Sequence, residues 1–373
     1  MKLKTSIASA ILVAISSTGA HAAPQYQITQ IQPFLGGTSS QAHGINNSGY
    51  IVGKYKPVTD GEAGTQSGFL YNSNTGTTQN LGNLGGSRTS ARASNSSNQV
   101  VGYSRPNEGS SEYNAFLYKD GVLNNLGTLG TGNYSYAHAI NESGQVAGHS
   151  HTNASGTTSE AFIYENGTMT SIGTLGGKSG GAFDINDNGI VTGTSTTASA
   201  DTQGFIYQDG VMTSLGSLDG TGYSEARAIN NKNQIVGNSL SENGNYHTFL
   251  YEGGIMQDLG TIEGDSFAYD INEKGQIVGG YRSHLLESSG HAYVYKDGEM
   301  FDLTSLLSAG DQDSWELKAA YGINDAGQIV GWGSFNGVNQ AYLLSEVPLP
   351  ASVFLLTPAL GLLGFMGKRR KTS

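Results

Sequence analysis

The chain has 373 residues, including 55 glycines and no cysteine, and 13% of its residues are charged, about half the usual fraction for a soluble domain. This composition excludes a coiled coil, a helical bundle and any disulfide bond. The formal net charge of −11 opposes binding to a phosphate backbone, so we expect no nucleic-acid partner.

The N-terminal residues 1–22 predict a secretory signal peptide. Two lysines precede an apolar run from Ile7 to Ile15, and the small-residue triplet Ala20-His21-Ala22 follows. This layout directs a chain to export, and the alternative is a short buried helix. We therefore expect an exported mature chain that begins at Ala23.

Residues 23–346 contain seven copies of one unit, such as AHGINNSGYIVGKY at 42–55. Each copy has a marker asparagine, and successive markers are 42 to 52 residues apart. The marker asparagines are Asn46, Asn95, Asn141, Asn186, Asn230, Asn272 and Asn324. A four-stranded propeller blade repeats at about 40 to 50 residues. The spacing therefore predicts an all-β chain with seven propeller blades.

Each unit predicts four short strands. The first two form a hairpin around the marker, and the third residue after the marker is always Gly or Asn, the residues that tolerate positive φ. These turn residues are Gly49, Asn98, Gly144, Gly189, Asn233, Gly275 and Gly327. The third strand carries an aromatic stripe that we expect to pack between blades. The fourth follows a turn such as Asp120-Gly121.

The two ends of this repeat region add up to one blade. Tyr26 to Ile31 leads into a segment that is similar to the end of a fourth strand, whereas Gly322 to Leu344 supplies only strands one to three. We therefore expect a seven-bladed ring closed by the N-terminal strand, with no open edge between the first and last blades. The long interval before Asn324 predicts an insertion around Gly310 to Trp315.

Three residues before each marker stands a side chain that is larger than most of its neighbours. These ring residues are His43, Arg92, His138, Phe183, Arg227, Tyr269 and Tyr321. If the first strand is innermost, they point toward the channel mouth or an adjacent blade junction. Aromatic, histidine and arginine groups can stack on sugars and hydrogen-bond to them, so the ring is the candidate ligand-binding site. The alternative is that these side chains only wedge between blades.

Motifs for catalysis or cofactors fail on their context. Gly177-Lys178-Ser179-Gly180-Gly181 matches a hydrolase elbow, but no helix pattern follows it, and it lacks the first glycine of a phosphate loop. The eight histidines include no metal-ligand set, so we expect no metal and no cofactor. Carboxylate pairs for glycoside hydrolysis would have to come from different blades, and we assign no catalytic residue. The acids near blade junctions are Asp184, Asp219, Glu225, Glu263 and Asp270.

The C-terminal residues 347–373 predict a membrane-spanning sorting segment. The stretch from Val347 to Gly367 has 21 residues without a charge, enough for a helix to cross a bilayer about 30 Å thick. Four basic residues then hold the end on the cytoplasmic side, namely Lys368, Arg369, Arg370 and Lys371. A buried core helix is the alternative.

This tail resembles a PEP-CTERM sorting signal of the VPLPA type. The motif reads Val347-Pro348-Leu349-Pro350-Ala351 and departs from the Pro-Glu-Pro form at Leu349. The resemblance implies an exosortase-type membrane protease as a partner, in a Gram-negative bacterium that makes exopolysaccharide. It also implies that the helix anchors the exported chain in the inner membrane before processing.

The repeats resemble the HAF family of extracellular repeats, named for a His-Ala-Phe triplet. Near matches are His291-Ala292-Tyr293 and Asn114-Ala115-Phe116, and Leu126 to Gly130 matches a companion element. Most copies lack the histidine, so we give it no chemical role. The resemblance spans Tyr26 to about Ser345 and implies an extracellular repeat protein without an established activity.

These features together predict a secreted or cell-surface propeller that is sorted through its tail and is not an enzyme. We expect it to bind a glycan or another component of the cell surface or of an exopolysaccharide biofilm matrix. One alternative is a polysaccharide-acting hydrolase or lyase on the same scaffold, and another is a passive structural adhesion protein. Propellers host all three classes, so the fold does not choose among them.

Overall fold

The computed structural model describes residues 24–348, apart from 33–36, 60–61, 221 and 284–289. Within this part the chain is all-β, as predicted, and its helices are η2 (Thr304–Leu306) and α1 (Ala309–Gln312). The predicted signal peptide and the sorting tail from Leu349 onward, including the basic cluster, lie outside the described residues. A search of the described part finds no helix long and apolar enough to cross a membrane.

Consecutive antiparallel strands form four-stranded sets, which we call repeat sheets and number along the chain. Repeat sheet 1 contains β2 (Ser39–Ile45), β3 (Tyr50–Lys56), β6 (Ser67–Asn72) and β7 (Thr77–Asn80). Repeat sheet 2 contains β8 (Thr89–Ser94), β9 (Val100–Ser104), β10 (Asn114–Lys119) and β11 (Val122–Gly127). A two-residue pair, β4 (Val58–Thr59) and β5 (Glu62–Ala63), extends the loop after β3.

The next two sets are joined by a single parallel pair between Ser159 and Ser179. Repeat sheet 3 contains β12 (Ser135–Ile140), β13 (Val146–His151), β14 (Ser159–Glu165) and β15 (Thr168–Gly173). Repeat sheet 4 contains β16 (Gly176–Ile185), β17 (Val191–Thr197), β18 (Thr202–Gln208) and β19 (Val211–Ser214). Repeat sheet 5 contains β20 (Ser224–Ile229), β21 (Ile235–Leu240), β22 (Tyr246–Glu252) and β23 (Ile255–Gly260).

The last two sets bring the ends of the described chain together. Repeat sheet 6 contains β24 (Asp265–Ile271), β25 (Ile277–Arg282), β26 (His291–Lys296) and β27 (Glu299–Asp302). Repeat sheet 7 contains β28 (Trp315–Ile323), β29 (Ile329–Phe335), β30 (Val338–Glu346) and, at its edge, β1 (Tyr26–Ile31). β1 is antiparallel to β30, with Tyr26 opposite Glu346. The extra residues before β28 form η2 and α1.

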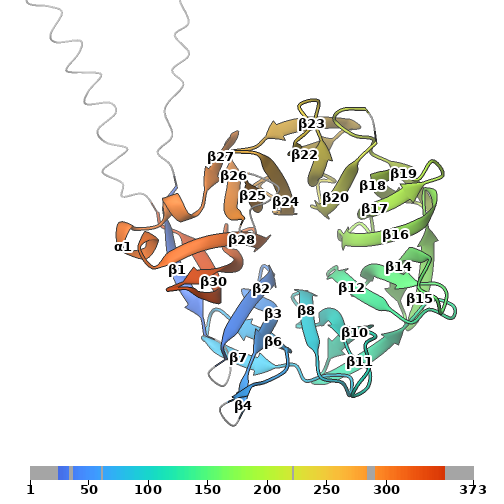
Figure 1. Ribbon diagram of the computed structural model, residues 1–373, viewed down its shortest axis with the longest axis horizontal. Coiled ribbons are helices and arrows are strands. Elements are labelled where there is room, and N and C mark those ends of the chain that lie inside the picture. Colours follow the sequence, from blue (N-terminus) through green and yellow to red (C-terminus); the bar gives the residue numbers. More distant parts are fainter. Residues whose placement is uncertain (1–23, 33–36, 60–61, 221, 284–289, 349–373) are drawn as a thin grey trace, which may run out of the picture.

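The repeat sheets are arranged around a central axis, and the first strand of each lies nearest to it (Figure 1). The hairpins at the markers have the predicted backbone, because all seven turn residues have positive φ, from 59° at Asn98 to 83° at Gly144. In the first hairpin, the Gly49 amide donates to the Asn46 carbonyl and the Asn46 amide donates to the Tyr50 carbonyl. A type I turn closed by a bulge makes these bonds.

The apolar core lies between neighbouring repeat sheets. Val52 and Leu70 of repeat sheet 1, for example, pack in one cluster with Ala91 and Phe116 of repeat sheet 2. The leading aromatic residue of every third strand is no more than 2% exposed, namely Phe69, Phe116, Phe162, Phe205, Phe249, Tyr293 and Tyr342. Burying one such ring contributes about 1.5–3 kcal/mol, so each repeat sheet is stabilised by its neighbours. The predicted packing role of the aromatic stripe is confirmed for this position.

The glycine of the Ile-Val-Gly strand is required by a close approach between strands. In repeat sheet 3, a Cβ added to Gly148 would lie 2.1 Å from the Tyr136 carbonyl oxygen and 2.7 Å from Cζ of Phe162. The facing strand β12 also carries a register shift between Ala137 and Ala139. The second strand can pack against the first strand and against the buried ring only without a side chain at this position.

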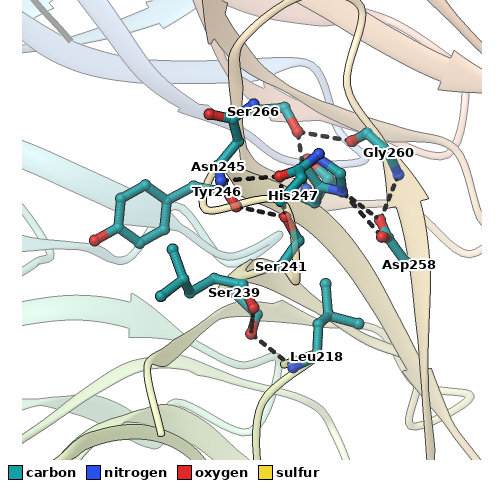
Figure 2. A network of polar contacts seen from close by, with 12 residues as sticks. Leu218, Ser239, Ser241, Asn245, Tyr246, His247, Asp258, Gly260 and Ser266 are labelled. Carbon is teal, nitrogen blue, oxygen red and sulfur yellow. Dashed lines mark hydrogen bonds and ion pairs between the residues drawn. The ribbon is translucent and has the colours of Figure 1, made fainter. Parts of the chain in front are cut away.

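Buried serine hydroxyls hold the links between repeat sheets, as Figure 2 shows for repeat sheet 5 and the start of repeat sheet 6. The Ser239 hydroxyl accepts from the Leu218 amide at 2.9 Å, and the Ser266 hydroxyl donates to the Gly260 carbonyl at 2.8 Å. The leucine-to-serine bond recurs in the pairs Leu84–Ser104, Leu129–Ser150 and Leu175–Ser195. The Leu-Gly-x-Leu links are therefore tied to the second strand that follows them.

Candidate functional site

The predicted ring residues line one cavity of about 160 Å³ on the central axis. Each lies on the first strand of its repeat sheet, three residues before the marker, so the repeat itself brings them together. The cavity is lined by all seven, namely His43, Arg92, His138, Phe183, Arg227, Tyr269 and Tyr321. Asp184 and Asp270 also line this cavity.

Neighbouring ring residues also contact one another across the gaps between repeat sheets. The ring centroids of Tyr269 and Tyr321 are 5.1 Å apart, and those of His138 and Phe183 are 5.4 Å apart. The Arg227 guanidinium lies 4.5 Å from the centroid of the Phe183 ring. The ring residues thus pack between repeat sheets and border the cavity at the same time. Small-ligand sites have volumes of about 300–1,000 Å³, so this cavity admits a small group, and a larger ligand would contact its rim.

Two ring histidines are held neutral. The His43 Nδ1 donates to the Ala91 carbonyl at 2.7 Å, and burial together with the charge of Arg92 lowers the pKa of His43 well below its usual value. His138 Nε2 lies 3.0 Å from Nδ1 of His149. Burial, followed by the neighbouring His149 and Arg92, likewise lowers the pKa of His138. In the neutral His43 ring the one N–H is bound to Ala91 and Nε2 is an acceptor, whereas in His138 it is Nδ1 that is not part of the bond to His149.

Two of the acids considered for hydrolysis bind neighbouring backbone groups instead. Asp184 accepts from the amides of Ile185 and, one repeat sheet further on, Ile229, each at 2.8 Å. Asp270 accepts in the same way from its own following amide and from Ile323 in the next repeat sheet. Burial raises the pKa of Asp184 to about 6 and that of Asp270 to about 8. Both carboxyl groups therefore link repeat sheets.

The structure does not bring the other three acids into the cavity. Glu225 forms an ion pair with the ring residue Arg227. Asp219 lies in the link before β20 and accepts from the Ser217 hydroxyl at 2.9 Å. Glu263 is exposed. Within the described residues, no group of three or more His, Asp or Glu side chains is placed to hold a metal ion.

The marker asparagines have a second role, beyond the turn, that sequence reasoning missed. The side-chain nitrogen of each donates to the carbonyl of the marker in the next repeat sheet, at 2.9 Å from Asn46 to Asn95 and at 3.3 Å from Asn324 back to Asn46. The five bonds between them measure 3.0 or 3.1 Å. Oδ1 of Asn46 meanwhile accepts from the amides of Ser48 and Tyr50 in its own turn.

A signal for this bond was present in the sequence. Aspartate serves as well as asparagine where only a turn amide must be bound, yet all seven markers are asparagine. A side-chain donor is therefore required at each one, and aspartate has none when ionised. The residue after each marker is variable and includes Glu142, Asp187 and Asn231, whose side chains need only accept from an amide of the neighbouring repeat.

Comparisons with known proteins support the fold and leave the activity open. Residues 20–85 match a family model described as a protein of unknown function (DUF3466). A search of curated proteins finds no match. Among solved structures, the chain is similar to an acylaminoacyl peptidase from Pyrococcus horikoshii, with 9% identity, a TM-score of 0.55 and coverage of 88% of this chain and 55% of the peptidase.

Two further similarities have lower scores. TolB from Acinetobacter baumannii has 12% identity and a TM-score of 0.42, with coverage of 80% of this chain and 64% of TolB. The β-propeller domain of the Trilobed protease from Pyrococcus furiosus has 10% identity and a TM-score of 0.39, with coverage of 84% and 86%. The chain thus spans less than two thirds of the first two of these proteins. At such identities the likeness concerns the fold alone, which is all-β with propeller-like neighbours.

Proposed function

We propose that the chain is an exported, seven-bladed propeller, closed by β1, that binds a glycan of the cell surface or extracellular matrix without transforming it. The pairing of β1 with β30 and the hydrogen bond from Asn324 back to Asn46 support closure. The signal-like N-terminus and the PEP-CTERM-like tail support export and sorting by an exosortase-type protease. The similarity of the repeats to the HAF family supports an extracellular location.

The observation that carries glycan binding is the convergence of the seven ring residues on one cavity. The ring offers aromatic faces for sugar C–H groups, an imidazole acceptor on His43 and guanidinium donors for hydroxyls. Tyr269 and Tyr321 present adjacent rings, and Arg92 and Arg227 add cationic donors. A terminal sugar or a chain segment would contact the rim, since the cavity itself is small.

A polysaccharide hydrolase or lyase is the second candidate, and it rests on Asp184 and Asp270. These are carboxyl groups with raised pKa in the cavity wall, and perturbed acids of this kind are common in active sites. Each, however, already accepts two backbone hydrogen bonds and links two repeat sheets. These hydrogen bonds favour a structural role for both carboxyl groups, so we propose that the protein binds a glycan without cleaving it.

The test is a glycan array together with a depolymerisation assay on the purified full chain, with exopolysaccharide of the host bacterium among the polymers. We expect saturable binding without a change in polymer length, and at least about tenfold weaker binding after Tyr321→Ala, because one stacked contact contributes about 1.5 kcal/mol. Tyr295→Ala, on a third strand away from the cavity, is the matched control. Shortening of a polymer would favour the enzyme, and silence in both assays would favour a passive adhesion protein.

A further inference from the structure

Arginines occupy equivalent places in two halves of the molecule. Arg92 and Arg227 stand three residues before a marker, and Arg105 and Arg282 stand ten residues after one. Each guanidinium lies over an aromatic ring, at centroid distances of 5.3 Å for Arg92 on Tyr103, 5.3 Å for Arg105 on Tyr113, 4.5 Å for Arg227 on Phe183 and 5.0 Å for Arg282 on Phe267. Arg92 can therefore be compared with Arg227, and Arg105 with Arg282, at equivalent positions of the repeat.

The two halves differ in their anionic partners. Arg227 forms an ion pair with Glu225, and Arg282 lies 3.5 Å from a carboxylate oxygen of Asp265. In repeat sheet 2, the positions equivalent to these two acids hold Ser90 and Arg88. Among the residues that the structure describes, no ion pair is formed by Lys54, Lys56, Arg88, Arg92 or Arg105.

The unpaired cations lie close enough to affect one another. Arg92 donates to the Tyr103 hydroxyl at 3.2 Å. Burial lowers the pKa of Lys54, and the charge of Arg92 lowers it further. Burial, the largest single influence, would raise the pKa of Tyr103, but the charges of Arg92 and Lys54 together with the hydrogen bond from Arg92 lower it. This is a local positive potential in a chain of net charge −11.

These cations are also partly desolvated, which makes the missing partner costly. The Nε atoms of all four arginines are buried without a hydrogen-bond partner among the described residues, and Arg92 and Arg105 also lack the carboxylate that Arg227 and Arg282 have. Glu108 and Glu112, the acids in the loop after Arg105, form no ion pair there either. A charge withdrawn from water without a partner is destabilising, and an external anion would remove that cost.

Tyrosine rings form a platform beside these cations. The centroids of Tyr103 and Tyr136 are 4.8 Å apart, and the rings of Tyr134 and Tyr136 are parallel within 8° at 6.3 Å. All three rings are half-buried, so part of each is open to solvent. Lys54 and Lys56 line an adjoining hollow of about 210 Å³. Aromatic faces beside unpaired cations suit a sugar ring that carries an anionic substituent.

We infer that Lys54, Arg88, Arg92, Arg105, Tyr103 and Tyr136, here called the basic–tyrosine surface, bind the carboxylate-bearing sugars of an anionic polysaccharide. The inference rests on the proposed glycan binding and adds the charge class of the ligand. Single-stranded nucleic acid also combines cations with stacking. Each nucleotide, like each uronate, carries one negative charge, so the polysaccharide is favoured here by the proposed glycan binding and the oligonucleotide is a competing ligand in the test.

The test compares two polymers with one backbone, polygalacturonate and its fully methyl-esterified form, as ligands of the full chain. We expect the charged polymer to bind at least about tenfold more tightly at low salt, with the preference falling as salt is added. The double variant Arg92→Gln/Arg105→Gln should remove the preference. Arg282→Gln, equivalent to Arg105 but already paired with Asp265, should preserve it.

A second variant tests the inference without removing any arginine. Ser90→Glu places a carboxylate where Glu225 stands relative to Arg227, so an internal partner should replace the external one and weaken polygalacturonate binding. Because Ser90 is buried, circular dichroism must show that this variant folds. If it does not fold, the result for the double variant Arg92→Gln/Arg105→Gln decides the test.

The outcomes separate the inference from the proposed function. Equal binding of both polymers, or a preference that survives the double variant, would overturn the anionic class and leave glycan binding in place. Tighter binding of a single-stranded dT oligonucleotide than of polygalacturonate would overturn the polysaccharide assignment. No binding of either polymer or of any arrayed glycan would remove the proposed function and this inference together.

Discussion

The hydrogen bonds between marker asparagines can be tested by a substitution that replaces one non-hydrogen atom. In Asn272, Oδ1 accepts from the amides of Lys274 and Gln276, while Nδ2 donates to the Asn324 carbonyl at 3.0 Å and to Oε1 of Gln276 at 2.7 Å. Asn272→Asp keeps the turn acceptor and replaces the donor with an oxygen that faces two other oxygens.

The expected cost follows from these contacts. Losing two hydrogen bonds costs about 1 kcal/mol each, and leaving a buried carbonyl unsatisfied adds about 1–3 kcal/mol. Asn272 is only 4% exposed, so water cannot replace the partners. We therefore expect a loss of at least about 3 kcal/mol in the free energy of unfolding and a fall in Tm of about 6–12 °C.

The pH dependence gives this prediction a distinct signature. Burial and the two facing oxygens would raise the pKa of the new carboxyl group above its value in the unfolded chain. A group with a raised folded pKa destabilises increasingly as pH rises toward that pKa, and its protonated form can donate one of the lost bonds. Thermal melts followed by circular dichroism should therefore show a larger deficit at pH 8 than at pH 5.

The control is an asparagine that acts only as an acceptor. Asn83 is exposed, its Oδ1 accepts from the Gly85 amide at 2.9 Å, and Asn83→Asp should leave Tm within about 1 °C of the wild-type value. A melt of Asn272→Asp that coincides with the control at pH 8 would refute the assigned role of the marker donor.

Two further predictions concern the strands. Gly148→Ala should destabilise by more than about 3 kcal/mol in denaturant titrations, because its Cβ would lie 2.1 Å from the Tyr136 carbonyl oxygen, whereas Gly310→Ala has open space and should be neutral; equal midpoints would contradict the close-approach argument. Asp270 has a folded pKa of about 8 against about 3.9 when unfolded, so its contribution to stability is fully present below pH 4 and is lost as pH rises to 8. Alanine occupies the equivalent position in repeat sheets 2, 3 and 5, so Asp270→Ala is a suitable reference. The Tm of the wild type relative to this variant should fall as pH rises from 4 to 8, and a constant difference would refute the raised pKa.

Features set by the local backbone could be predicted from the sequence. Positive φ at residues such as Gly49 and Asn98 follows from the small set of residues that tolerate it, and the repeat spacing indicates four strands per unit. Burial of Phe116 and its equivalents follows from alternation on a strand. Each of these inferences needs only residues that are near in sequence.

Features that depend on a partner one repeat away were harder to predict. The sequence places Asp184 among the candidate catalytic acids, because nothing near it in sequence reveals that its carboxyl group accepts from the Ile229 amide. That Arg92 lacks an ion-pair partner among the described residues follows only from comparison with Arg227, whose partner Glu225 is replaced by Ser90 in repeat sheet 2. Ile229 lies 45 residues from Asp184, and Arg227 lies 135 residues from Arg92.

The repeat itself separates structural from functional positions. A requirement of the fold acts on every copy, so the marker is asparagine in all seven, and its donor and acceptor are both used. The ring position, by contrast, holds His, Arg, Phe or Tyr in the same backbone setting. Packing alone does not demand such different charges on equivalent strands. The variation at the ring and at the unpaired cations beside it agrees with the ligand recognition that we propose there, while the invariant asparagines hold the repeat sheets together.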